Sequence, residues 1–274
     1  MHAQLFTFAY RMACITLLSD LGLQDASVGR VKGILAQRLA GVAVIDISHD
    51  VSPYHLQQAA YLLHSSLPTF APGTLHIVLV DLFYAQDSRI IVCRCNQQYF
   101  IAPDNGILSM ALRNDDYEAW IMPTEKRAIH LTEVAHDIAA LGTKILSGED
   151  IFGKMGACSI ANPLVNWEPK QIGNSLECHI MHIDRFENVI LNITKDQFDA
   201  ARQNRNFRIE FFMDAVTEIN EHYSSVKQGE ILGRFNSSGY LEIAINRGKA
   251  ASLLGLKLNR EQNLVYKAIK IIFE

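Results

Sequence analysis

The fold is decided by residues 15–35, ITLLSDLGLQDASVGRVKGIL. Residues 15–18 form a short apolar run, which is typical of a buried strand, and a polar turn follows it. Asp25 or Ser27 can then cap a helix that continues to about Leu39. Because a buried strand followed at once by a helix is the repeating unit of α/β proteins, this stretch predicts an α/β fold for the sequence around it.

The alternation of strand and helix continues to about residue 155. Pro53 precedes one of the expected helices and fits its first turn, where a missing N–H costs little. The pattern predicts a mostly parallel sheet with helices on both faces. The expected strands are residues 42–47, 75–82, 90–95 and 99–102, and the expected helices are residues 54–67, 106–112 and 133–146.

The pattern changes after about residue 165, where strand-like runs are joined by turn signals such as Gln228-Gly229. We therefore expect an α/β domain over residues 13–162 and an all-β, barrel-like domain over residues 170–274, with a linker at 162–169. The expected strands of the second domain are residues 176–183, 189–193, 207–212, 240–245 and 264–272.

Composition excludes several classes of function. The chain has 274 residues, of which 49% are hydrophobic and 20% charged, and its net charge is −4. This balance gives no support for a nucleic-acid partner or an acidic membrane surface. The apolar runs are shorter than the roughly 20 residues that a membrane span needs. The N-terminal stretch lacks the cationic start of a signal peptide, so none is expected.

The cysteines point to a reducing compartment. There are five of them, an odd number, and none lies in a CxxC pair. Cys93 and Cys95 alternate with Val92 and Arg94 in a strand-like run, so both should point to one face and pack there. We expect reduced core cysteines and a cytoplasmic protein.

Acidic residues at strand ends are the first candidates for chemistry. Asp20 follows the first strand, and ligands of open α/β sheets bind at the carboxyl ends of strands. Together with Asp25 and Ser27, Asp20 could bind hydroxyls or an ammonium group. A helix cap explains Asp25 and Ser27 equally well. Asp81 ends a buried apolar strand, and Arg89 lies near the start of the next one. A simple ion pair between these two residues and a catalytic role are both open.

Turns and hairpins supply the remaining candidates. Asn105 lies in the turn at residues 103–106, where a structural role is the default reading. Phe186 could stack on a base while Asn188 bonds the edge of that base, but the same segment is also an ordinary hairpin. His179 and His182 are three apart in one expected strand and so point to opposite faces. We therefore expect no metal site.

Six segments in order make the sequence similar to the S-adenosylmethionine (SAM) hydroxide adenosyltransferase family, the relatives of fluorinase and chlorinase. Each motif is weak alone, but the ordered set is highly specific and covers nearly the whole chain. The segments are ITLLSDLGLQDASVGRVKGIL, VIDISHDVSPYHLQQAAYLL, FAPGTLHIVLVD, YFIAPDNGILS, HIDRFENVILNI and NSSGYLEIAINRGKAASLLGL.

The resemblance implies a SAM site and a role for each candidate. It implies homotrimers whose SAM site lies between the N-terminal domain of one subunit and the C-terminal domain of the next. SAM is then the substrate and adenosine a product, with no cofactor and no metal. Asp20 should hold the ribose hydroxyls, and Tyr54 should lie over the sugar. Around the methionine end and the adenine, the implied binding residues are Asp25, Ser27, Asn105, Asp184, Phe186, Asn188, Ser237 and Ser238.

The resemblance also implies hydrolysis of SAM to adenosine and methionine by in-line attack of water or hydroxide at C5′. The catalytic candidates are Asp81, Arg89 and His136. The sequence departs from the family here, because residues 81–85 read DLFYA in place of Asp-Pro-Gly-Val-Gly. Arg89 lies one place later than the family arginine. The family segment Phe-His-Gly-Arg-Asp is missing, and His136 is the nearest equivalent of its histidine.

Two other functions stay open. The altered loop after Asp81 would suit a SAM- or adenosine-binding protein with little or no catalysis. Chloride or another anion could also replace water as the nucleophile. Asp81 disfavours this last possibility, because a carboxylate repels a halide that must lie nearby.

Overall fold

The computed structural model describes residues 14–113, 115–123, 130–161, 168–211, 214–258 and 269–274. The chain divides into two compact units, Met1–Leu164 and Val165–Glu274. Most of the expected linker, residues 162–167, lies outside the described residues.

The first unit contains one six-stranded sheet with the order β2-β1-β3-β5-β4-β6. The first four strands in this order, β2, β1, β3 and β5, are parallel to one another. The strand β4 is antiparallel to both of its neighbours, β5 and β6. The sheet is therefore mostly parallel, which confirms the predicted fold class. The strands are β1 (Ile15–Ser19), β2 (Val44–Ser48), β3 (Leu75–Leu79), β4 (Ile90–Cys95), β5 (Gln98–Pro103) and β6 (Tyr117–Ile121).

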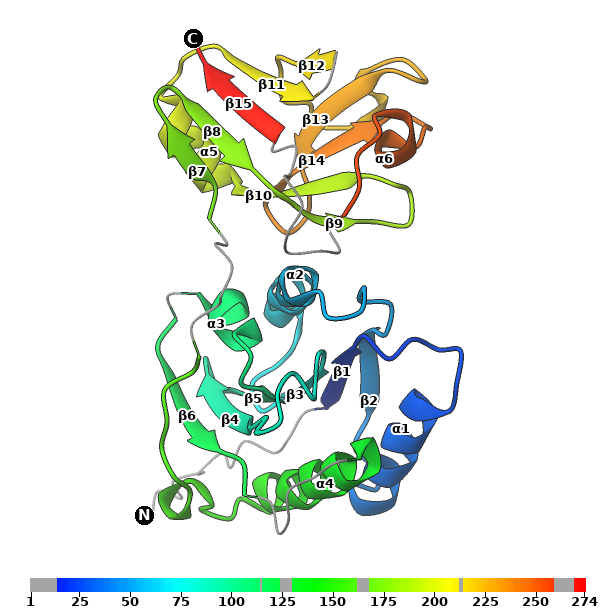
Figure 1. Cartoon of the computed structure of the whole chain (residues 1–274), viewed down its shortest axis with the longest axis vertical. Coiled ribbons are helices and arrows are strands. Elements are labelled where there is room, and N and C mark those ends of the chain that lie inside the picture. The colour runs from blue at the N-terminus through cyan, green and yellow to red at the C-terminus, as the bar shows by residue number, and fades with distance from the viewer. Residues whose placement is uncertain (1–13, 114, 124–129, 162–167, 212–213, 259–268) are drawn as a thin grey trace, which may run out of the picture. The chain divides into compact units, whose positions relative to one another are not determined.

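Helices cover both faces of this sheet. Figure 1 shows α1 and α4 on one face and α2 and α3 on the other. Their bounds are α1 (Ser27–Arg38), α2 (Leu56–Ser66), α3 (Ile107–Leu112) and α4 (Leu131–Ser147), with short 3-10 turns at Leu67–Thr69 and Phe152–Lys154.

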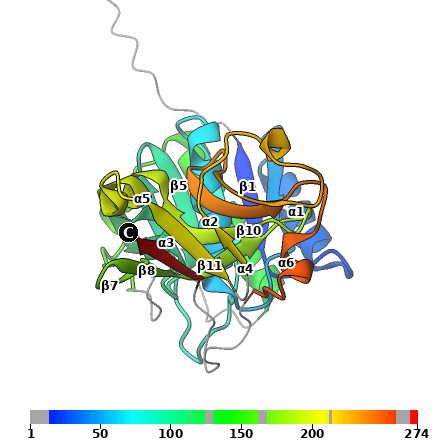
Figure 2. The ribbon, with the colours of Figure 1, turned by 90° about the horizontal axis from the view of Figure 1, so that it is seen from above.

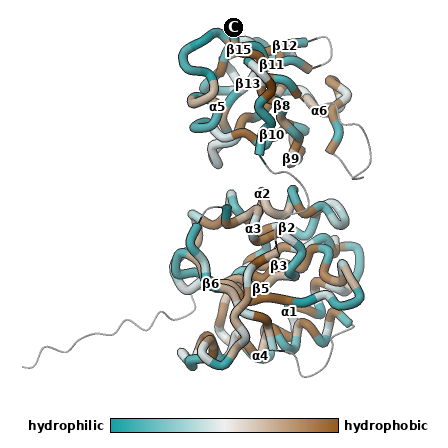
Figure 3. Tube along the Cα trace, turned by 60° about the vertical axis from the view of Figure 1, so that its left-hand side comes forward, coloured by the Kyte–Doolittle hydropathy of each residue, from teal (hydrophilic) through white to brown (hydrophobic). Residues whose placement is uncertain are grey.

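The core under α1 and α4 explains why the alternating segments fold in this way. Ile15, Leu17 and Ile77 point to this face and are fully or almost fully buried. Figure 3 shows the hydrophobic residues gathered in the central strands of the unit. The helices pack closely where α4 carries Gly142, because a Cβ there would lie 3.1 Å from Leu39 Cδ1. Burial of each large aliphatic side chain stabilises the fold by about 1.5–3 kcal/mol.

The second unit consists of two antiparallel sheets with a few short helices. One sheet has the order β13-β14-β10-β9 and the other β12-β11-β15-β8-β7. Figure 2 shows β15 between β11 and β8. The strands are β7 (Lys170–Ile172), β8 (Ser175–Cys178), β9 (Ile180–Ile183), β10 (Val189–Thr194), β11 (Phe207–Phe211), β12 (Asp214–Val216), β13 (Ile231–Phe235), β14 (Tyr240–Ile245) and β15 (Ile269–Phe273). The helices are α5 (Lys195–Arg202), α6 (Ala250–Leu253) and a 3-10 turn at Tyr223–Ser225.

One expected strand of this unit was wrong in its extent. Residues 176–183 form two strands, because β8 pairs with β15 in one sheet and β9 pairs with β10 in the other. The chain changes sheets at His179, whose backbone N–H donates to Asn192 Oδ1 at 2.7 Å. His179 and His182 therefore do not share a strand.

Candidate functional site

Four of the predicted site residues meet at the carboxyl edge of the parallel strands. Asp20 follows β1, Asp81 follows β3 and Asn105 follows β5, and these three strands are parallel neighbours. Tyr54 lies on the loop between β2 and α2. Since the carboxyl ends of adjacent parallel strands share one edge, the fold brings together residues that are far apart in the sequence.

A single carboxylate oxygen joins three of these segments. Asp20 Oδ2 accepts the backbone N–H of Tyr54 at 3.0 Å and the backbone N–H of Asp81 at 3.2 Å. Both donors have a left-handed backbone, with φ of 64° at Tyr54 and 49° at Asp81. Non-glycine residues adopt this conformation at a cost and keep it where the surroundings hold them. Asp20 is thus a structural centre of the cluster.

The Asp81 side chain is half-buried, and its carboxyl group has an altered acidity. Burial raises the pKa of Asp81, and the negative charge of Asp20 raises it further. A carboxylate with a raised pKa is a stronger base than an ordinary aspartate. The arrangement can therefore accept a proton from a bound water.

Asn105 forms hydrogen bonds with protein groups at both ends of its side-chain amide. Its Nδ2 donates to Val80 O at 3.1 Å and to Asp81 O at 3.4 Å. Its Oδ1 accepts the backbone N–H of Ile107 at 3.3 Å. The amide thus links the end of β3 to the start of α3.

Arg89 pairs with a different aspartate from the one considered in the sequence. Its guanidinium binds Asp104 Oδ2 through Nη2 and through Nε, the latter at 2.7 Å. The Asp104 side chain is 1% exposed, and its Oδ1 accepts the backbone N–H of Ala161 at 2.7 Å. The alternative of an ion pair between Asp81 and Arg89 was therefore wrong. In the sequence, Asp104 was considered only as part of a turn.

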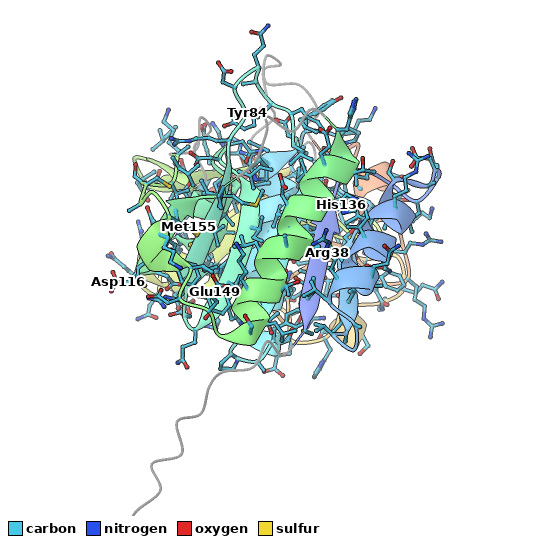
Figure 4. The ribbon with its side chains drawn as sticks, turned by 90° about the horizontal axis from the view of Figure 1, so that it is seen from below. Arg38, Tyr84, Asp116, His136, Glu149 and Met155 are labelled. Carbon is cyan, nitrogen blue, oxygen red and sulfur yellow. The ribbon has the colours of Figure 1, made fainter. Side chains whose placement is uncertain are left out.

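His136 lies on helix α4. It is exposed in the second turn of α4. Figure 4 shows it on the side of α4 that faces α1. No interaction within the described ranges joins His136 to Asp81, so its catalytic role stays a prediction.

Asp25 and Ser27 organise the start of α1. Asp25 Oδ1 accepts the backbone N–H of Ser27 at 2.7 Å, and this hydrogen bond lowers the pKa of the exposed Asp25 carboxyl group. The contact is an Asx-type turn just before the helix. The N-cap of α1 is Ala26 and has no side-chain cap, so the helix cap that the sequence offered as an alternative to ligand binding was wrong.

The binding candidates of the second unit lie in two hairpin loops. Between β9 and β10, Asp184 Oδ1 accepts the backbone N–H groups of Phe186 at 2.9 Å and Asn188 at 2.8 Å. Its Oδ2 accepts Asn188 Nδ2 at 3.0 Å. The loop holds the Phe186 side chain 74% exposed, so its ring is available for stacking.

Ser237 and Ser238 occupy the other loop, between β13 and β14. Asn236 Oδ1 accepts the backbone N–H groups of Ser238 at 3.0 Å and Tyr240 at 3.1 Å. This Asx-type turn fixes the loop and leaves Ser237 exposed. The Asn-Ser-Ser-Gly sequence carries the signal for the turn.

Two buried polar groups near the candidates were missed in the sequence. His49 Nδ1 is 2.7 Å from Ser19 Oγ and ties the end of β1 to the loop after β2. In the second unit, Glu242 accepts the hydroxyl of Tyr223 at 2.7 Å, and burial raises the pKa of Glu242. Only the pairing of strands reveals these contacts.

Within the described part of the chain, no three His, Cys, Asp or Glu side chains are grouped so as to hold a metal ion. In the same residues, no helix combines the length and the apolar character that crossing a membrane requires. All five cysteines are free thiols, and Cys93 and Cys95 are buried on β4 as expected.

The chain is similar to several known proteins. It is 27% identical to a Thermus thermophilus protein named (R)-S-adenosyl-L-methionine hydrolase, over 90% of this chain and 97% of that protein. It is 24% identical to a protein of an Actinoplanes species named fluorinase, over 89% of this chain and 94% of that protein. A crystal structure of an uncharacterized conserved protein from Thermotoga maritima superposes with a TM-score of 0.80 at 25% identity. It covers 94% of this chain and 99% of that one.

Two domain profiles of one family match the two halves of the sequence. The SAM hydroxide adenosyltransferase N-terminal domain matches residues 15–165, and the C-terminal domain matches residues 178–262. These ranges contain every candidate residue named above. The chain therefore belongs to the SAM hydroxide adenosyltransferase family.

Proposed function

We propose that this protein hydrolyses SAM to adenosine and methionine. The observation that carries the proposal is the half-buried Asp81 at the carboxyl edge of β3, held by Asp20 and carrying a raised pKa. A base of this kind is what the attack of water on C5′ requires. The names of relatives that span most of the chain support the same reaction.

The protein's own contribution to this reaction is modest. The oxygen of water forms a bond to C5′ while the bond from C5′ to the sulfonium sulfur breaks. The bonding pair leaves with sulfur, which becomes the neutral thioether of methionine, and the proton of water passes to Asp81. Because the sulfonium is an excellent leaving group, no cofactor is needed. Positioning of the water and assistance of its deprotonation are the tasks left to the protein.

Substrate binding is assigned to both units. Oδ2 of Asp20 bonds two backbone N–H groups, and we assign its Oδ1 to the ribose hydroxyls. Phe186 would stack on the adenine, with Asn188 at the edge of the base. Asp184 would attract the ammonium of the methionine part. We assign Tyr54, which is 72% exposed, to the wall over the sugar.

We further infer a homotrimer with its sites at subunit interfaces and a location in the cytoplasm. Exposed apolar side chains support the assembly. Leu23 and Tyr54 are 71% and 72% exposed in the first unit, and Phe186 and Leu253 are 74% and 70% exposed in the second. Large exposed apolar groups often mark surfaces that a partner covers. Analytical ultracentrifugation tests the assembly, and a monomer at the assay concentration would contradict it.

A second candidate function is a SAM- or adenosine-binding protein with little catalysis. The pairing of Arg89 with Asp104 favours it, because this pair removes one expected catalytic group from Asp81. An adenosyltransfer to chloride is less favoured, because Asp81 and Asp20 would repel the anion.

Incubation of the purified protein with SAM, with and without chloride, separates these functions. The proposal predicts adenosine and methionine in both samples, formed at least about a hundredfold more slowly by Asp81→Asn. SAM binding by calorimetry without any product would favour the binding protein. A 5′-chlorinated nucleoside formed only with chloride would favour the transfer to chloride.

A further inference from the structure

The peptide group of Asp81 is held from two sides by side chains of other strands. Its N–H donates to Asp20 Oδ2 at 3.2 Å. On the other side, Asn105 Nδ2 donates to the carbonyl oxygens of Val80 and Asp81, at 3.1 and 3.4 Å. These contacts join the ends of β1, β3 and β5 at the one residue that the proposed reaction needs as a base.

The ladder of the sheet explains why such contacts are required. The strand β3 ends at Leu79, so Val80 and Asp81 lie beyond its regular pairing with β1 and β5. Val80 is 0% exposed. A buried carbonyl without a donor costs about 1–3 kcal/mol, so a donor must replace the missing strand partner. Asn105 supplies that donor.

The backbone conformation of Asp81 also requires these contacts. Its φ of 49° is left-handed, which a non-glycine residue keeps only where contacts hold it. The side-chain direction follows from the backbone angles, so a loss of these contacts would turn the carboxylate as well as the peptide. The position of the base thus depends on Asp20 and Asn105.

The hydrogen-bonding capacity of Asn105 is largely used in this way. An asparagine amide has two N–H donors, and here two backbone carbonyls accept from Nδ2. Its Oδ1 accepts from the backbone of Ile107. A substrate acceptor would have to displace one of the two carbonyls to bind the Nδ2 group.

We propose that Asn105 is a positioning residue, which acts on the reaction through the backbone of Asp81 and not by contact with SAM. Asp20 holds the other side of the same peptide, so the two side chains form a clamp around Asp81. The inference rests on the proposed function, since it assigns the clamp to the base of that reaction.

The kinetic test is Asn105→Ala, with Asn174→Ala as the matched control. Asn174 also donates from Nδ2 to a backbone carbonyl, that of Phe273 at 3.0 Å, in the second unit. We expect Asn105→Ala to lower kcat by about tenfold or more, the equivalent of one lost hydrogen bond to a placed base, with KM changed less than about twofold. Asn174→Ala should change neither value. A raised KM at unchanged kcat would make Asn105 a substrate ligand and overturn the inference.

A second test does not need turnover, so it separates failure of the clamp from failure of the proposed function. The Tm is measured for Asn105→Ala alone and in a chain that also carries Asp81→Gly. Glycine adopts a left-handed backbone without strain, so it should depend less on the clamp. We expect a smaller loss of Tm from Asn105→Ala in the Gly-substituted chain. Equal losses in the two chains would show that Asn105 does not hold the Asp81 backbone.

Discussion

The candidate residues of the first unit are held by distant parts of the chain, whereas those of the second unit are held by their own loops. Asp20 bonds the backbones of Tyr54 and Asp81, 34 and 61 positions away. Asp184 bonds residues two and four positions away, and Asn236 does the same. The difference teaches that the first cluster exists only when the whole sheet is formed. Each loop of the second unit carries most of its own geometry.

This contrast suggests different roles for the two units, catalysis in the first and binding in the second. A residue at a junction of several strands can be fixed closely, which suits a catalytic base. A hairpin loop that fixes itself can present an exposed ring such as Phe186, which suits binding. Substitution of Asp81 at the junction should therefore change turnover, and substitutions in the loops should change affinity.

The largest effect is expected from Asp81→Asn. Loss of the base should lower kcat by roughly 10²–10⁴-fold, the usual contribution of general-base catalysis. SAM affinity by calorimetry should stay near that of the unchanged protein, because the amide keeps the size of the side chain. Unchanged turnover in this variant would remove Asp81 from the mechanism.

Asp20→Asn should act on both binding and pH dependence. Loss of the charged acceptor should weaken SAM binding by about 1.5–3 kcal/mol, measured by calorimetry. Removal of its negative charge should also lower the pKa of Asp81, because that charge now raises it. Turnover needs the ionised form of Asp81 and is lost as the pH falls through its pKa. The acid limb of the kcat profile should therefore move to lower pH in Asp20→Asn.

The pH profile has its own control. In Asp25→Asn an acidic side chain is lost in the same unit, but Asp25 lies at the start of α1, and the charge that raises the pKa of Asp81 is that of Asp20. Its acid limb should coincide with that of the unchanged protein. An acid limb of Asp20→Asn that does not move, or moves upward, would contradict the coupling of the two carboxylates.

Phe186→Ala tests the loop of the second unit. Stacking of a base on an aromatic ring contributes about 1–3 kcal/mol, so SAM affinity should fall by that amount. The Tm should stay the same, because the ring is 74% exposed and supports little packing. A lower kcat at saturating SAM with unchanged affinity would break the proposed division between the units.

The smallest effect is expected from Asp25→Ala. Its carboxylate accepts the Ser27 N–H at the start of α1 and is exposed. Loss of this hydrogen bond should lower the Tm by no more than a few degrees and leave turnover unchanged. A marked loss of SAM affinity would restore Asp25 to the binding site and correct our interpretation of it as part of the turn before α1.

The sequence predicted the strand ends but not the contacts between them. Asp20 and Asp81 were placed correctly, because each follows a short apolar run that forms a buried strand. Their junction could not be predicted, since it depends on β1 and β3 being neighbours. The loops at Asp184 and Asn236 contain turn signals, because their hydrogen bonds stay within four residues.

The prediction for Arg89 is the one in which the sequence was least informative. We considered Asp81 as its partner because the two strands follow one another in the chain. In the sheet, however, β5 lies between β3 and β4. Ile90 at the start of β4 is opposite Pro103 at the end of β5, so Arg89 lies beside Asp104. A crossover of this kind leaves no local signal.

The most direct test of the central claim is to run the reaction in water enriched in 18O and analyse the products by mass spectrometry. The account predicts adenosine that carries the label in its 5′-hydroxyl group, together with unlabelled methionine, and at least about a hundredfold slower formation of this product by Asp81→Asn. Label in the methionine part, or release of methylthioadenosine in place of adenosine, would show that water does not attack C5′ and would contradict the account.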